Sequence, residues 1–337
     1  MRTAETDSEI SVARERALHR FAMLAAGATF CLIFVGGLVT STGSALAVPD
    51  WPLAFGKLIP AWQGGIRFEF GHRVVAAIVV TLTLILMAWA WRVEPRRWVR
   101  NTILAAFGLI IVQAILGGIT VLFELPLPIA VAHAGTAQAF FCLMVSIAIF
   151  TNPRWTRTTH RSERPARIPL AMLAGITTAV IYLQILVGAV MRHLGAGLAI
   201  PDFPLAFGQL IPPYWNEYIA VNFAHRCGAV LVTIMVVWTV ARVLRSHRDE
   251  PELRHPALGL FLLLVMQICL GAITIWSGRA VIPTTSHVLI GAAVLATSLT
   301  IAIRAYHVFG ITSRGGAAHT VASAAREEHP LRHQVSA

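Results

Sequence analysis

Eight apolar runs, each about 20 residues long, constrain this chain more than any other feature of its sequence. The runs cover approximately residues 21–41, 70–92, 101–122, 129–150, 169–190, 222–243, 257–277 and 284–305. An α-helix of this length crosses the hydrocarbon core of a bilayer. The segments between the runs are too short for a substantial soluble domain. We therefore predict an all-α membrane protein with eight transmembrane helices.

Charge supports this fold class and gives the chain an orientation. Only 13% of the residues are charged, about half the usual share in a soluble domain. Lys and Arg concentrate in the two tails and in alternate loops, whereas the opposite side carries Lys57, Arg67, Arg192 and Arg279. Because cytoplasmic loops are the ones enriched in Lys and Arg, we expect a multi-pass protein of the cell (inner) membrane with both termini in the cytoplasm. The net charge of +11 then reflects topology, and the expected partner is the lipid bilayer, not nucleic acid.

The chain also repeats itself. Residues 49–60 (PDWPLAFGKLIP) and 201–212 (PDFPLAFGQLIP) are identical at ten of twelve positions, and a His-Arg pair follows each segment. A repeat of four helices returns the chain to its starting side, so the two halves keep the same orientation. We predict two pseudo-symmetric four-helix bundles. The predicted segments are a cytoplasmic N-terminal tail (1–20), a first half (21–168), a second half (169–308) and a polar, disordered cytoplasmic tail (309–337).

Each half carries two histidines at similar depth. His72 lies near the extracytoplasmic end of the second predicted helix, and His133 lies about one turn into the fourth. His225 and His287 hold the equivalent places in the second half. Two imidazoles on helices of the same direction suit bis-histidine ligation of a haem iron between helices. The alternatives are buried histidines bonded to neighbours, another metal or a proton path, although zinc lacks a third or fourth ligand in either half.

Small and basic residues near these histidines fit a cofactor held between helices. A Gln-x-x-x-Gly pattern recurs at 113–117, 184–188 and 267–271, and glycine lets a flat ring or a second helix approach the backbone closely. Arg73 and Arg226 directly follow histidines near the outer boundary. We expect them to bind the cofactor by pairing with haem propionates. Plain helix packing and snorkelling to lipid headgroups are the alternatives.

The halves differ three residues before the first histidine of each pair. The first half has Glu69 there, and the second has Asn222. A spacing of three puts Glu69 on the same helix face as His72, where a carboxylate could take up protons or stabilise positive charge. We therefore predict Glu69 as a catalytic residue and the first half as the reactive one. The alternative is a helix-start carboxylate favoured by the helix dipole.

The remaining cysteines and histidines carry less information. The cysteines fall inside predicted helices without paired spacing, so neither a disulfide nor a thiolate metal site is expected; they are Cys31, Cys142, Cys227 and Cys269. The other histidines fall in predicted loops, in tails or in the leader, and we expect them to be solvated. They are His19, His160, His193, His247, His255, His307, His319, His329 and His333.

Taken together, these residues resemble the haem A synthase family, the CtaA/Cox15 proteins, over roughly residues 20–305. The resemblance rests on Gly36-Gly-Leu-Val-Thr-Ser-Thr-Gly43-Ser, on Pro49-Asp-Trp-Pro-Leu53, on Glu69-Phe-Gly-His72-Arg73, and on His133, His225-Arg226 and His287 in duplicated halves. The family oxidises the C8 methyl group of haem O to a formyl group, which gives haem A for terminal oxidase assembly.

The resemblance implies a role for each half. His72 and His133 are expected to bracket the substrate haem O, with Glu69 close to it, while His225 and His287 are expected to ligate a haem b cofactor. The outer loops around Asp50 and Asp202 are expected to fold as lids over the haem edges, with simple turns as the alternative. Haem O synthase and an unidentified electron acceptor are the further partners that this function implies.

One departure from the family pattern concerns cysteine. Many bacterial members carry a cysteine pair flanking the Pro-Asp-Trp-Pro-Leu stretch, where this chain has Val48 and Ala54, with Ile200 and Ala206 in the second half. A thiol-dependent step or a loop-locking disulfide is therefore not expected, and the chain resembles the members without the pair.

Three other functions stay open from the sequence. An electron-transfer cytochrome b with two bis-histidine haems would not need the asymmetry at Glu69. A transporter would usually place broken helices and charges near the bilayer midplane, whereas the polar residues here gather at the outer face. A non-catalytic haem-handling assembly factor is the third alternative.

Overall fold

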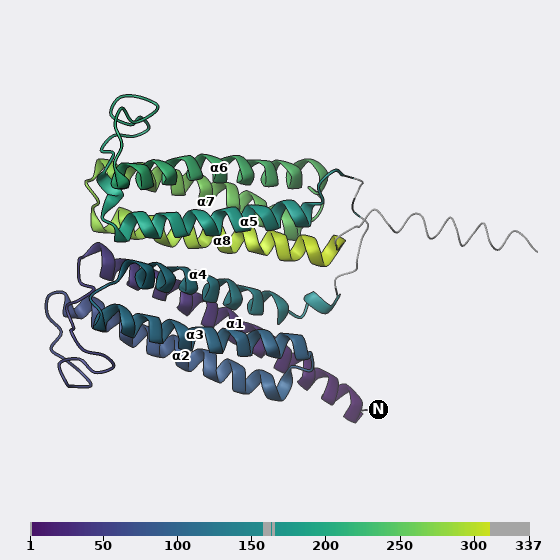
Figure 1. The fold of residues 1–337 in the computed structure, drawn as a ribbon. Coiled ribbons are helices and arrows are strands. Elements are labelled where there is room, and N and C mark those ends of the chain that lie inside the picture. Colours follow the sequence, from purple (N-terminus) through teal and green to yellow (C-terminus); the bar gives the residue numbers. More distant parts are fainter. Residues whose placement is uncertain (1, 158–162, 164–165, 311–337) are drawn as a thin grey trace, which may run out of the picture.

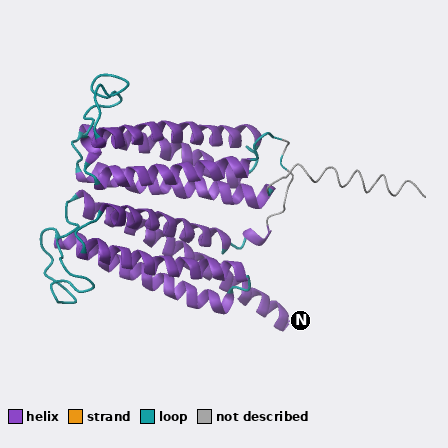
Figure 2. Ribbon diagram, in the orientation of Figure 1, coloured by secondary structure: helices purple, strands orange, loops and turns teal. Residues whose placement is uncertain are grey.

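The computed structural model of the chain describes residues 2–157, 163 and 166–310, and most of these residues are helical (Figures 1 and 2). The long helices are α1 (Arg2–Ser41), α2 (Ile66–Val93), α3 (Arg97–Leu122), α4 (Leu127–Phe150), α5 (Leu170–His193), α6 (Glu217–Ser246), α7 (Pro251–Trp276) and α8 (Val281–Phe309). Within the described residues, eight helices are long and apolar enough to cross a membrane. The predicted fold class is confirmed.

The helices extend beyond the apolar runs from which they were predicted. Helix α1 begins at Arg2 instead of near residue 21, and α6 begins at Glu217 and ends at Ser246. Hydropathy marks only the part of a helix that suits hydrocarbon, whereas backbone hydrogen bonding continues into the polar ends. The predicted division into two tails and two halves stays a prediction, and the tail expected over 309–337 lies outside the described residues from position 311.

Each half is a four-membered ring of helices. In the first half α1 packs beside α2 and α4, and α3 packs beside the same two helices; in the second half α5 and α7 are placed in the same way between α6 and α8. Helices α2 and α4, and likewise α6 and α8, therefore stand diagonally opposite each other across their bundles. This is the geometry in which four-helix bundles build sites from inward-facing side chains.

The two bundles lie side by side and share an interface made by α1 and α4 from one half and α5 and α8 from the other (Figure 1). Each bundle has its own apolar core, and a smaller cluster of Ile33, Phe141, Ala292 and Ala296 joins them. Polar groups also cross the interface. The Arg192 guanidinium on α5 donates to the Gly37 carbonyl and to the Ser41 hydroxyl of α1, both at 2.8 Å.

Two long loops leave the same end of the molecule, which we call the loop end (Figure 1). They connect α1 to α2 (residues 42–65) and α5 to α6 (residues 194–216). Helix α1 begins and α8 ends at the opposite end, the terminal end. The loops on one side and the chain ends on the other agree with an even number of crossings.

The two loops contain the same turn. Asp50 accepts hydrogen bonds from the Phe55 and Gly56 amides at 2.7 and 2.8 Å, and Asp202 accepts from Phe207 and Gly208 at the same distances. Backbone hydrogen bonds, above all the one from the glycine, hold the pKa of each aspartate below its ordinary value. The repeat in sequence is therefore a repeat in local structure.

Candidate functional site

The four histidines lie near the loop end of their helices, one on each even-numbered helix. His72 is on α2 and His133 on α4, which stand across the first bundle, while His225 on α6 and His287 on α8 stand across the second. The rings of the second pair are 6.5 Å apart between centroids, with an angle of 68° between their planes. Two imidazoles that share one metal at roughly 2 Å from each donor nitrogen have ring centroids roughly 6 Å apart. The second pair is therefore spaced for one metal between the rings.

A glycine on the preceding helix faces each of these imidazoles. A Cβ atom built on Gly36, Gly117, Gly188 or Gly271 would lie 3.1, 3.1, 2.9 or 3.2 Å from the Cε1 atom of the histidine that it faces. Those distances are at or below the limit of van der Waals contact, so a side chain there would push the ring away. The same helix-to-ring packing thus occurs four times, and in three cases the glycine is the one in the Gln-x-x-x-Gly pattern.

The glutamine of that pattern binds the same histidine. The Gln113 amide donates to the His133 carbonyl at 2.9 Å and lies 3.4 Å from its ring Nε2. Gln184 donates to the His225 carbonyl at 2.7 Å and lies 3.0 Å from its Nδ1. Gln267 lies 3.3 Å from His287 Nε2, and the Nδ1 atom of that ring is 3.2 Å from the Gln267 carbonyl. The sequence pattern marks a ring-holding pair and not helix packing alone.

The donor set fits a haem better than a bare metal ion. The Nδ1 atoms of His72 and His133 are buried without a hydrogen-bond partner, and a bound group is one explanation of an unpaired buried polar atom in a native structure. No group of three His, Cys, Asp or Glu residues that could hold a metal occurs in the described part of the chain. Two imidazoles would suffice to hold a haem, because the porphyrin supplies the remaining iron ligands, and the glycines let the imidazole rings lie close against the neighbouring helices.

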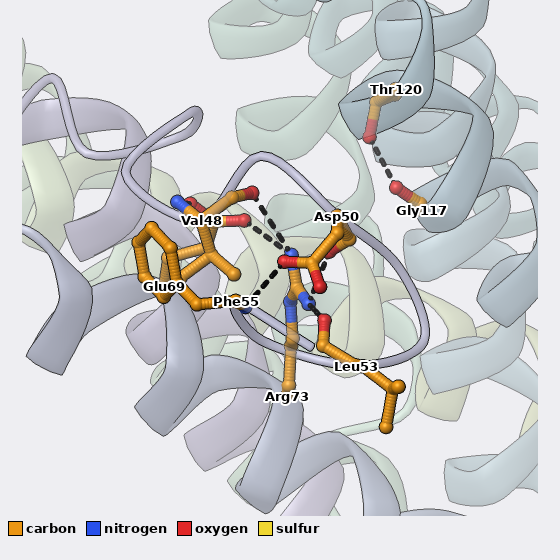
Figure 3. A network of polar contacts seen from close by, with 8 residues as sticks. All are labelled: Val48, Asp50, Leu53, Phe55, Glu69, Arg73, Gly117 and Thr120. Atoms are coloured by element: carbon orange, nitrogen blue, oxygen red, sulfur yellow. Dashed lines mark hydrogen bonds and ion pairs between the residues drawn. The ribbon is translucent and has the colours of Figure 1, made fainter. Parts of the chain in front are cut away.

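Glu69 belongs to a network that fastens the outer loop of the first half (Figure 3). Its side chain is 5% exposed, accepts a hydrogen bond from the Val48 amide at 2.8 Å, and forms an ion pair with Arg73 at 2.7 Å. The Arg73 guanidinium also donates to the carbonyls of Asp50 and Leu53 at 2.8 Å and of Val48 at 3.3 Å. The carboxylate therefore sits beneath the loop, one turn from His72, with its charge compensated.

The second half repeats this network without the carboxylate. The Arg226 guanidinium donates to the carbonyls of Leu205, Asp202 and Ile200 at 2.7, 2.8 and 3.0 Å, and to the side-chain oxygen of Asn222 at 3.0 Å. Asn222 in turn donates to the Ala196 carbonyl. Both arginines thus hold outer loops in this structure, and the propionate contact expected for Arg73 and Arg226 stays a prediction.

The loops fold back onto the helices beside the histidines. The Trp51 indole packs against Gly118 on α3, where a Cβ would lie 2.7 Å from the ring, next to the glycine that faces His133. In the second half Phe203 holds the equivalent place and contacts Trp276 edge to face at 6.3 Å. One aromatic side chain of each outer loop therefore contacts the neighbouring helix, α3 or α7, and the expected role of the loops as lids over the haem edges stays a prediction.

Four of the histidines expected to be solvated are not: His19 and His193 are half-buried, and two others contact distant segments. His247 is buried, packs against the Phe309 ring and lies 3.5 Å from the Glu163 carboxylate. Burial lowers the pKa of His247, and the negative charge of Glu163 opposes that shift. His307 stacks on Trp155 and reaches its carbonyl at 2.8 Å. Both contacts join segments far apart in the sequence, so local composition does not signal them. His160, His319, His329 and His333 lie outside the described residues, and the four cysteines are free, as predicted.

The fold and the site together define a class: a duplicated eight-helix membrane protein with a histidine pair across each of two parallel bundles. Residues 68–299 match the COX15-CtaA family of cytochrome oxidase assembly proteins. The chain belongs to this family, as the sequence motifs predicted.

Individual relatives support the same assignment. The chain is 32% identical over 251 residues to the Heme A synthase of Symbiobacterium thermophilum, an alignment that covers 71% of this chain and 79% of the relative. It is 28% identical over 255 residues to the Heme A synthase of Staphylococcus saprophyticus (74% and 83%). It is 27% identical over 270 residues to that of Staphylococcus haemolyticus (78% and 87%).

Proposed function

We propose that this protein is a haem A synthase, an oxidoreductase that converts the C8 methyl group of haem O to a formyl group. The observation that carries the proposal is the pair of imidazoles across each bundle, in a chain of a family whose relatives are named Heme A synthase. Such a pair would hold a haem by its iron.

The two halves take different roles in this proposal. His72 and His133 would hold the substrate haem O, and His225 and His287 would hold a resident haem b, which supplies redox chemistry when bound. Glu69 is the proposed catalytic carboxylate, because the equivalent Asn222 cannot accept a proton at neutral pH. Arg73 positions Glu69 through their 2.7 Å ion pair and ties it to the loop. The Arg73 and Arg226 guanidinium groups already donate to loop carbonyls. A contact with a haem propionate would therefore require each guanidinium to divide its N–H donors between the propionate and the loop.

The surroundings favour chemistry at the loop end. Trp51 and the first loop cover the bundle beside His133, so they can exclude water from the porphyrin. With the positive-inside orientation, this end faces away from the cytoplasm in the cell (inner) membrane, and both termini are cytoplasmic. Haem O synthase and an electron acceptor are the proposed partners.

The asymmetry between the halves favours this function over a di-haem electron-transfer cytochrome. A relay needs two haem sites that hold their cofactors in similar ways, whereas here one site has a buried carboxylate and the other an amide. A non-catalytic haem-handling factor would have no use for a proton acceptor beside the porphyrin.

Co-expression tests the proposal. The full chain is produced with a haem O synthase in a host that lacks haem A, and the membrane haems are extracted and separated by chromatography. Haem A that appears only with this chain is the expected result. Haem O without haem A, in membranes that contain a functional electron acceptor and the folded protein, would contradict it.

A further inference from the structure

One of the four histidines lacks a glutamine contact that the other three have. Glutamine stands one turn before the ring-facing glycine on α3, α5 and α7, and each of these glutamines contacts its histidine. On α1 the same position, four residues before Gly36, is Leu32. Leucine has no donor for a ring or a carbonyl. His72 is therefore the site without the amide that holds the other three rings.

In the second half, glycines on the facing helices leave space for the two glutamine side chains. Gly228 on α6 lies directly against the Gln184 amide, and a Cβ on Gly291 of α8 would lie 3.2 Å from Gln267 Nε2. At the position equivalent to Gly228, three residues after His72, the first half has Val75. In the first half, leucine therefore replaces the amide donor, and valine fills the space that the glycine leaves in the second half.

The absence of the amide leaves the His72 ring without polar support in the described structure. Its Nδ1 atom is buried with no hydrogen-bond partner, whereas His225 and His287 each have a partner at a ring nitrogen. The Nδ1 atom of His133 also lacks a partner, but Gln113 donates to the His133 carbonyl and lies 3.4 Å from the Nε2 atom of its ring. Groups that hydrogen-bond a metal-ligating histidine fix the orientation of its ring, and their loss typically lowers metal affinity 10- to 100-fold, an order-of-magnitude range.

We propose that Leu32 and Val75 make His72 a releasable axial ligand, so that the first half exchanges its haem while Gln184 and Gln267 keep the second-half haem resident. The inference deepens the proposed function, on which it rests for the identity of the exchanged haem as substrate. A substrate haem must leave after each conversion, and one weakly held ligand is enough to open that route. Gln113 keeps His133 in place as the stationary partner.

Haem transfer to an acceptor measures this property without any conversion. The full-length protein is purified, loaded with haem B in both halves and mixed with excess apomyoglobin, and transfer is followed by absorbance. We expect a fast phase from the first half and a slow phase from the second. The His133→Ala protein, which keeps the second-half pair, assigns the slow phase. A single phase for the fully loaded protein would overturn the inference.

The decisive variant introduces into the first half both the glutamine and the glycine that leaves space for it. In Leu32→Gln/Val75→Gly protein, the fast phase should slow by about tenfold or more. The matched control is Leu32→Met/Val75→Gly, which has a side chain of similar length without an amide and should leave the fast phase unchanged. Equal effects of the two variants would overturn the inference, because packing alone would then explain them.

The reverse change guards against a variant that fails to fold. Gln184→Met should accelerate the slow phase by about tenfold and should change the low-spin electron paramagnetic resonance signal of the second-half haem alone. An unchanged slow phase would contradict the proposal. Normal haem A production with unaltered transfer rates would remove this inference but not the proposed function. Absence of haem A with the expected transfer rates would contradict the proposed function but not this inference.

Discussion

Arg73 and Arg226 show how much of a site depends on partners that carry no sequence signal. Their position after a histidine predicted a place near the site, and the structure puts them there. Most of their contacts, however, are with backbone carbonyls of the loops at residues 48–53 and 200–205. Every residue has such a carbonyl, so only the folded loop shows which ones an arginine will find.

The role of Glu69 can be tested with a substitution that preserves its shape. Glu69→Gln keeps an oxygen for the Val48 amide but removes the negative charge that pairs with Arg73. We expect haem A output to fall by roughly 100-fold, the usual scale for a lost proton acceptor, while the second-half haem spectrum is retained. Extracted haems and the spectrum of the purified protein measure the two effects.

Asn222→Asp is the matched control for that substitution. It adds a carboxylate at the equivalent place in the second half, beside Arg226, and removes the amide that donates to the Ala196 carbonyl. In membranes where the variant folds and keeps its second-half haem, haem A output should stay close to normal. Normal output from Glu69→Gln would remove Glu69 from the catalytic assignment.

The aspartate turns predict a pH dependence of the loops. Backbone donors lower the pKa of Asp50 and Asp202 in the folded state, so their stabilising effect is present above the unfolded pKa of about 4. It is lost as the pH falls through the lower folded value. Hydrogen exchange of peptides covering 48–60 and 201–212, corrected for intrinsic rates, should show constant protection from pH 7 to about 5 and loss below about 4.

Asp50→Asn provides the comparison for the first loop. The amide oxygen can still accept from one of the two backbone groups but carries no charge, so protection of 48–60 should be lower and independent of pH over the acid range. Protection of 201–212 should keep its pH dependence. An acid-stable first loop in the unmodified protein would contradict the assignment.

At the level of the helices, the sequence predicts existence well and boundaries poorly. All eight spans follow from apolar length, but α1 begins at Arg2 and α6 extends through Ser246 because polar helix ends leave no hydropathy signal. The Gln-x-x-x-Gly pattern predicted a close approach to the helix backbone, and the structure shows that the approaching group is the histidine ring. The sequence could not show that the glycine faces the ring while the glutamine binds the same histidine, because this depends on how two helices are aligned against each other. The Gly36 contact lacked the glutamine and gave no such pattern.

Helix α5 contains a matched pair of glycines that tests the ring contact. A methyl group at Gly188 would lie 2.9 Å from the His225 ring, whereas Gly175 has nothing within 4 Å. Gly188→Ala should displace the imidazole and lower second-half haem content several-fold, as second-sphere changes at metal sites typically do. The pyridine haemochrome assay measures haem per protein.

Gly175→Ala should leave haem content unchanged and slightly raise thermal stability, because alanine favours a helix interior by about 1 kcal/mol over glycine. Equal loss of haem in both variants would show that helix α5 tolerates no added methyl group, and the ring contact would then not be the cause.

The whole molecule is two bundles with one orientation, joined where Arg192 on α5 reaches Gly37 and Ser41 on α1. The duplication in sequence predicted this arrangement, since four crossings restore the chain to its starting side. It could not predict which helices meet, because no motif on α1, α4, α5 or α8 marks a contact between the two halves. Their contact depends on how small side chains such as Ala292 and Ala296 fit at the interface.

The proposed orientation can be tested with cysteines placed at opposite ends. In a background without the four native cysteines, Leu58→Cys lies in the first loop at an 82% exposed position, and Asp249→Cys lies at the terminal end, where the side chain is 94% exposed. A membrane-impermeant maleimide should label Leu58→Cys in intact cells and Asp249→Cys only after permeabilisation. The reverse pattern would invert the assigned topology.

Parallel repeats have an electrical consequence. Both histidine pairs lie at the loop ends of their helices, so an electron that passes from one haem site to the other travels along the plane of the bilayer and crosses almost none of its thickness. Moving one charge across the membrane costs or yields about 2.3 kcal/mol per 100 mV. A transfer at constant depth avoids that work. If both histidine pairs hold a haem as proposed, the rate of a step between the two haems should therefore be insensitive to membrane voltage, in an energised cell as in a detergent micelle.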